Sequence, residues 1–163
     1  MLVMTAFVQL KNYQMKKIFF ALSILFFALQ GHGQKLAPVK WTYQAVKTGD
    51  KQYNIVLTAN VESPWHIYSQ FVKKGPVPTT VQFAKNPLVV LNGTTKEQGK
   101  LEKKLDKNFG AVIGSFGGKV QFIQTITLKV ATKTKLTGTI EYMVCNEERC
   151  LPPTKQSFEV DIQ

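Results

Sequence analysis

The chain has 163 residues, 44% of them hydrophobic and 19% charged, which is enough apolar content for a folded domain of ordinary size. It carries 21 Lys and Arg against 10 Asp and Glu, a formal net charge of +11, yet Arg149 is its only arginine. Without an arginine-rich patch this charge argues against nucleic-acid binding, and we interpret the lysines as the solvent face of a β protein.

The N-terminal region has the pattern of an export signal. Met15-Lys16-Lys17 precedes an apolar run over residues 18–29, and small residues follow at 30–34. The run is too short to cross a bilayer comfortably, although a retained membrane anchor is the alternative. We expect residues 1–33 to be a signal peptide, residues 1–14 to be an upstream extension, and the exported protein to keep no stable membrane anchor. Three lysines leave with this segment, so 18 basic and 10 acidic side chains remain, a net charge of +8.

From residue 39 onward, apolar side chains recur with a period of two, which is typical of half-buried β-strands. Glycine, proline and asparagine turns separate the runs. Only residues 97–108 could form a helical turn, and Gly99 weakens it. We therefore expect one all-β domain over residues 34–163, an antiparallel β-sandwich of about seven short strands. In chain order the expected strands are centred on residues 39–45, 53–61, 81–83, 88–90 (ending at Asn92-Gly93), 120–130, 136–144 and 158–162.

Two cysteines, Cys145 and Cys150, are the only ones in the chain, and in an oxidising compartment we expect them to be bridged. A loop of about six residues makes a weak staple, worth roughly 2 kcal/mol against roughly 4.7 for a loop of one hundred. Pro152 and Pro153 lack amide hydrogens, so the chain after Cys150 should lie at an edge while Cys145 ends a regular strand. Cys145 should thus be the sheltered sulfur, and the bridge is either structural or a group that exchanges.

Other candidate residues have ordinary alternatives. His66 follows Trp65 and is either a member of the site or a half-buried histidine without a chemical role. One histidine and two cysteines at this spacing are a weak zinc signature, since His32 leaves with the signal. No phosphate-binding loop, catalytic triad or carboxylate pair is visible, and we expect neither a metal nor a cofactor.

The run from Tyr142 through Cys145 and Cys150 to Pro152-Pro153, together with Pro64-Trp65-His66-Ile67-Tyr68, resembles the N-terminal periplasmic domain of the thiol:disulfide interchange protein DsbD. The resemblance covers most of residues 38–163. It implies an immunoglobulin-like fold, a periplasmic location and relay of reducing equivalents by thiol–disulfide exchange. Cys150 would form the mixed disulfide with a partner and Cys145 would resolve it, with Tyr68, His66, Pro152 and Pro153 shaping the site.

The same resemblance implies the partners: thioredoxin-like redox proteins and a membrane electron-transfer protein, engaged by a monomer. The chain departs from the family in four ways. The cysteine loop is one residue shorter, and His66 stands where the family has a tyrosine, whereas Tyr68 matches. The stretch expected to match the family's cap loop, residues 94–100, has no aromatic residue, so shielding of the disulfide is absent or comes from Phe109. Up to Gln163 the family's membrane-spanning channel and thioredoxin domain have no counterpart, so we expect the electron donor to be a separate protein.

The alternative function is a non-catalytic, exported immunoglobulin-like module for binding or assembly, in which the disulfide only pins the last hairpin. A reduction potential of about −180 to −270 mV would favour exchange, and one below about −300 mV would favour the staple.

Overall fold

A computed structural model of the chain describes residues 36–163, and all regular structure in this part is β-strand. The signal peptide expected over residues 1–33 lies outside the described residues. The strands are β1 (Val39–Gly49), β2 (Gln52–Val61), β3 (His66–Tyr68), β4 (Thr80–Phe83), β5 (Val89–Gly99), β6 (Glu102–Asp106), β7 (Ala111–Phe116), β8 (Gly118–Leu128), β9 (Thr134–Tyr142), β10 (Val144–Cys145) and β11 (Thr154–Ile162).

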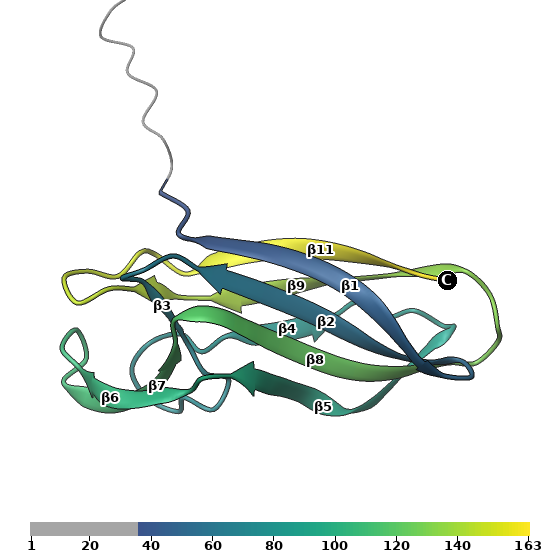
Figure 1. The fold of residues 1–163 in the computed structure, drawn as a ribbon, viewed down its shortest axis with the longest axis horizontal. Coiled ribbons are helices and arrows are strands. Elements are labelled where there is room, and N and C mark those ends of the chain that lie inside the picture. The colour runs from purple at the N-terminus through teal and green to yellow at the C-terminus, as the bar shows by residue number, and fades with distance from the viewer. Residues whose placement is uncertain (1–35) are drawn as a thin grey trace, which may run out of the picture. The chain divides into compact units, whose positions relative to one another are not determined.

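The strands form three antiparallel sheets (Figure 1). The first has the order β1-β2-β8-β5, the second β10-β3-β7-β6 and the third β11-β9-β4. Figure 1 shows β3, β6 and β7 at one end of this unit, close to the loop that follows β10. The all-β, antiparallel, immunoglobulin-like sandwich expected from the sequence is confirmed.

One large apolar core lies between the first and third sheets. It is built from the alternate residues of β2 and β8 that face inward, among them Ile55, Leu57 and Phe122, and from their counterparts on β9 and β11, such as Ile140 and Phe158. These side chains are 4% exposed or less. Burial stabilises the fold by about 1.5–3 kcal/mol for each large apolar side chain. Because these side chains lie on one face of each sheet, their burial favours packing of the two sheets face to face.

Gly138 on β9 shows how closely the third sheet is packed. It lies opposite Phe158 in the register of β9 and β11, and opposite Phe83 in the register of β9 and β4. A Cβ atom at this position would come within 2.5 Å of Cζ of Phe158 and would also meet the carbonyl oxygen of Gln82. The absence of a side chain therefore lets the Phe158 ring lie over the strand.

The structure corrects three expectations about the middle of the chain. Residues 97–108 form no helical turn, because β5 runs to Gly99 and β6 follows over Glu102–Asp106. The strand expected to end at Asn92-Gly93 continues through a register irregularity between Asn92 and Lys96. Of residues 94–100, expected to match the family's cap loop, all but the last are thus part of β5, whose last four residues from Lys96 pair with β8.

The number of strands was also underestimated, and the expected strand over 136–144 is divided. β9 ends at Tyr142 and pairs with β11 and β4, whereas β10 pairs with β3 in another sheet. Cys145 is therefore attached to the small sheet that also holds His66 and Tyr68. No helix in residues 36–163 is long and apolar enough to cross a membrane.

Candidate functional site

Cys145 and Cys150 are joined by a disulfide across a tight turn, with their Cα atoms 4.0 Å apart. The turn does not depend on the sulfur bridge alone. The amide of Asn146 donates to the carbonyl of Arg149 (2.9 Å), and the amide of Leu151 donates to the carbonyl of Val144 (2.9 Å). The Asn146 side-chain oxygen accepts the amides of Glu148 and Arg149 at 3.0 and 2.8 Å. These local bonds already close the hairpin, so the disulfide adds little constraint to it.

The two sulfurs lie in different surroundings. Cys145 is fully buried in a small apolar cluster with Tyr68 and Ile113, whereas Cys150 is half-exposed at the edge of that cluster. Pro152 and Pro153 are exposed and lie outside any strand, as the missing amide hydrogens predict. The expectation that Cys145 is the sheltered cysteine is confirmed, and Cys150 is the more exposed residue of the two.

A buried polar network lies next to Cys145. His66 is the cross-strand neighbour of Cys145 in the pairing of β3 with β10, so both side chains lie on the same face of the sheet. The hydroxyl of Tyr68 donates to Oδ2 of Asp106 at 2.5 Å, and Nε2 of His66 lies 3.2 Å from the same hydroxyl oxygen. Because the Tyr68 hydrogen goes to Asp106, Nε2 of His66 must be the donor to Tyr68, which leaves Nδ1 as its basic nitrogen.

This burial sets the protonation states of the network. Burial lowers the pKa of His66 below 6.5, an effect that nearby Lys104 reinforces and that Asp106 only partly opposes. Burial raises the pKa of Tyr68, and the hydrogen bond to Asp106 raises it further. For Asp106, burial acts to raise the pKa, but hydrogen bonds from Tyr68 and the Asn108 amide, with the contact to His66, bring it below 3.8. At neutral pH the network therefore holds a carboxylate, a phenol and a neutral imidazole.

The turn between β6 and β7 covers the buried side of the disulfide. Phe109 packs against the cluster that contains Cys145 and meets the Tyr68 ring edge-on, with centroids 6.1 Å apart. The side chain of Asp106 shapes this turn by accepting the amide of Asn108 at 2.9 Å. The segment at the disulfide is therefore this turn, with Phe109, and not residues 94–100.

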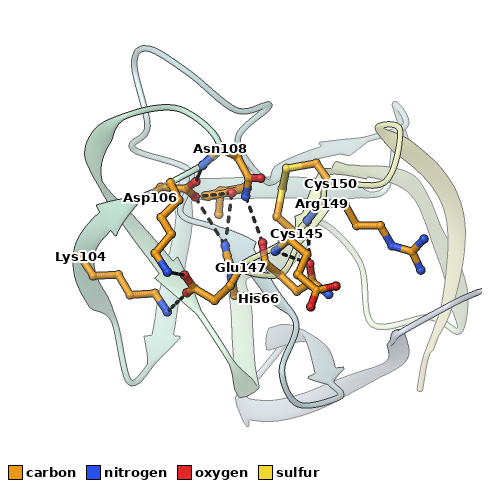
Figure 2. A network of polar contacts seen from close by, with 12 residues as sticks. His66, Lys104, Asp106, Asn108, Cys145, Glu147, Arg149 and Cys150 are labelled. Atoms are coloured by element: carbon orange, nitrogen blue, oxygen red, sulfur yellow. Dashed lines mark hydrogen bonds and ion pairs between the residues drawn. A yellow bond between two sulfur atoms is a disulfide. The ribbon is translucent and has the colours of Figure 1, made fainter.

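Polar contacts join the β6–β7 hairpin to the cysteine turn (Figure 2). The carboxylate of Glu147 contacts Nζ of Lys104 at 3.1 Å and Nζ of Lys107 at 3.4 Å. Nδ2 of Asn108 donates to the carbonyl of Asn146 at 3.0 Å. On the other side of the turn, the Arg149 guanidinium lies 5.9 Å from the centre of the Trp65 ring. The disulfide thus sits in a turn that is held from both sides.

The structure brings most of the sequence-predicted site residues together. Tyr68 and His66 lie beside Cys145, while Pro152 and Pro153 follow Cys150. Sequence reasoning missed Asp106, Lys104, Asn108 and Glu147. The sequence did hold one signal for this region, since residues 106–110, Asp-Lys-Asn-Phe-Gly, have the composition of a tight turn. The structure agrees, because Gly110 has a φ of +62°. In residues 36–163 no group of three or more His, Cys, Asp or Glu is placed to hold a metal ion.

Comparisons with known proteins give the family and the fold of the chain. The family described as "Thiol:disulfide interchange protein DsbD, N-terminal" matches residues 34–162. The reduced N-terminal domain of DsbD from Neisseria meningitidis superposes with a TM-score of 0.51 at 18% identity, covering 82% of this chain and 93% of that one. The N-terminal periplasmic domain of ScsB from Proteus mirabilis gives a TM-score of 0.49 at 15% identity, covering 78% and 49%. No curated protein sequence matches the chain.

Proposed function

Since the chain belongs to the family of the N-terminal domain of the thiol:disulfide interchange protein DsbD, we propose that it relays reducing equivalents through Cys145 and Cys150. The observation that carries the proposal is the asymmetry of the pair. One sulfur is buried beside a polar network and the other is half-exposed next to two exposed prolines. Exchange needs one sulfur that a partner can attack and a second that is kept for the resolving step.

In the first half of the cycle, a thiolate of a reduced thioredoxin-like donor attacks Sγ of Cys150. The Cys145–Cys150 bond breaks, and Cys145 leaves as a thiolate and takes up a proton. The second thiol of the donor then breaks the mixed disulfide, so two electrons and two protons pass to the pair. In the second half, the Cys150 thiolate attacks the disulfide of a target protein, and Cys145 displaces the reduced target.

The neighbouring residues have supporting roles in this proposal. His66 and Tyr68 position the surroundings of Cys145, because they keep polar, hydrogen-bonded groups beside a sulfur that must leave as a thiolate in a buried place. Pro152 and Pro153 keep the backbone after Cys150 out of the sheet, so that a partner can approach that sulfur.

The proposal extends to the setting of the protein. An export signal over residues 1–33 would bring the chain to the periplasm, where thioredoxin-like redox proteins and a membrane electron-transfer protein would be its partners. A monomer suffices for this function, because both cysteines and their buried neighbours belong to one chain.

Trapping a covalent intermediate tests the proposal. We expect the free Cys150 thiolate of Cys145→Ala to displace thionitrobenzoate from the activated single cysteine of a purified thioredoxin-like protein that lacks its own second thiol. The mixed disulfide should accumulate, because neither protein then holds a resolving thiol. Cys150→Ala should form none, because the remaining sulfur is buried. Non-reducing gels followed by mass determination measure the adduct. A trap with Cys150→Ala alone would reverse the two roles.

The same experiment separates exchange from the alternative of an immunoglobulin-like binding module with a structural bridge. If neither variant traps a partner and the reduction potential lies below about −300 mV, the structural reading is the better one. The hydrogen bonds that already close the turn argue against that reading, since a staple adds least where the backbone is paired without it.

A further inference from the structure

A groove lies beside the disulfide site, between the loop after β3 and the β6–β7 hairpin. Its volume is about 600 Å³, which is within the usual range for binding sites. Apolar side chains line most of it: Phe71 and Val72 from the loop, Leu101 before β6, and Val112 and Ile113 on β7. None of these residues has a part in the exchange reaction described above.

The groove is an unusually apolar piece of surface. Phe71 is 74% exposed, Val112 is 71% exposed and Leu101 is 43% exposed. Leu105, which pairs with Val112 across the hairpin, adds a fourth side chain at 61%. Four of the nine large apolar side chains that are exposed in residues 36–163 thus gather at one place. A contiguous exposed apolar patch marks an interaction site far more often than single exposed residues do.

The walls of the groove are fixed. The carboxylate of Glu97 accepts the Ser69 hydroxyl at 2.8 Å and the Gln70 amide at 2.5 Å, which ties the loop after β3 to β5. Gly114 forms part of the floor, where an added Cβ would lie 3.2 Å from Cδ1 of Leu101. A preformed groove costs a ligand less ordering entropy than a mobile surface would.

The charged side chains that line the groove itself all carry the same sign, whereas Glu97 lies behind Ser69 and accepts hydrogen bonds from the loop. The charged residues that line it are Lys73, Lys74 and Lys103, all of them exposed. Within residues 36–163 none of the three forms an ion pair, in contrast to Lys104 and Lys107 on the other face of the hairpin, which contact Glu147. Unpaired cations around an apolar groove complement a partner with the opposite charge.

The groove is also continuous with the redox site. Val72 and Ile113 line it and at the same time pack against the buried cluster that holds Cys145. A protein whose cysteine reaches Cys150 must cover the neighbouring surface. We infer that this groove docks the redox partner through a segment that presents a large apolar side chain flanked by carboxylates. The inference rests on the proposed exchange function and names the chemistry of its partner.

Peptide binding tests the groove without any redox step. The probes are acetyl-Glu-Phe-Glu-Leu-Glu-amide and its lysine counterpart, acetyl-Lys-Phe-Lys-Leu-Lys-amide, titrated into the oxidised protein by NMR. We expect the acidic peptide to shift amides of residues 69–74 and 111–114 and the basic peptide to bind at least tenfold more weakly. Val112→Glu should abolish the shifts, whereas Val46→Glu, at an exposed apolar residue of β1, should not.

Exchange kinetics test whether the partner uses the groove. Val112→Glu and Lys103→Glu should slow reduction by a reduced thioredoxin-like protein about fivefold or more and leave reduction by dithiothreitol unchanged. Val46→Glu and Lys129→Glu are the matched controls. Equal rates for groove and control variants, or peptide shifts outside the groove, would overturn the inference, and trapping at Cys150 would still stand. Binding to phosphatidylglycerol vesicles without binding of the acidic peptide would overturn it in favour of a membrane surface.

Discussion

Removal of one hydroxyl, in Tyr68→Phe, tests the polar network beside Cys145. The ring is fully buried and remains in place, so the substitution opens almost no cavity. It removes the donor that lies 2.5 Å from Asp106, whose side chain is itself buried, and the acceptor for Nε2 of His66. A hydrogen bond to a charged group contributes about 1.5–3 kcal/mol, and we expect Tyr68→Phe to lower the free energy of unfolding by about that amount at pH 7.

Urea unfolding followed by circular dichroism measures this loss, and Tyr53→Phe is the matched control. The Tyr53 hydroxyl donates to an uncharged acceptor, the carbonyl of Gln163 at 2.6 Å, so its loss should be smaller, about 0.5–1.5 kcal/mol. The difference between the losses of unfolding free energy in Tyr68→Phe and in Tyr53→Phe should shrink at acid pH. The pKa of Asp106 is lowered in the folded state, so the stabilisation that it provides is present above pH 3.8 and disappears as the pH falls through the lower folded value. Equal losses in the two variants at pH 7 would refute the description of a charged, buried network.

Three further predictions concern other parts of the structure. Because the pKa of His66 is lowered in the folded state, the unfolded chain binds a proton first as the pH falls below about 6.5. Stability should therefore fall with decreasing pH in that window, and His66→Gln should flatten the dependence in urea titrations; an unchanged slope would contradict the assignment. Glu147→Gln should speed reduction of the disulfide by dithiothreitol in low salt, because Lys104 and Lys107 lose their ion pairs and can then favour thiolates near the disulfide. Glu148→Gln should not change the rate, because Glu148 does not pair with these lysines. At about 1 M salt, where the Debye length is about 3 Å, wild type and Glu147→Gln should converge, and a difference that persists would rule out the ion pairs as its cause. Gly138→Ala should lower the unfolding free energy by about 1–3 kcal/mol through overpacking against Phe158, and thermal melts measure this loss. Gly117→Ala is the control and should be nearly neutral, because the nearest atom to its added Cβ would be 3.6 Å away.

The sequence was most informative where local chemistry decides the structure. Period-two alternation on β2 and β8 predicted their inward faces correctly, since successive side chains of a strand must point to opposite sides. The prolines after Cys150 predicted an interrupted sheet for the same kind of reason, because a residue without an amide hydrogen cannot complete a ladder. The relative exposure of the two cysteines followed from these local rules.

The sequence did not predict β6, because its apolar and polar side chains do not alternate. Four of its five residues are exposed, and two of these are lysines, so the strand has no apolar face to reveal it. The side chain of Lys104 contacts Glu147, more than forty residues further along the chain, and that contact exists only once the hairpin is placed.

Tertiary structure alone decided which polar residues complete the site around the cysteine pair. Asp106 meets Tyr68 across 38 residues of sequence, and Asn108 meets Asn146 across another 38. The split between β9 and β10 carries Cys145 from the sheet of its preceding strand to the sheet of His66. The chain by itself determined the long alternating strands, the cysteine pair and which cysteine is the more sheltered, because neighbouring residues fix those. Which polar groups surround the buried sulfur depends on the pairing of strands far apart in the sequence, and only the packed sandwich sets that pairing.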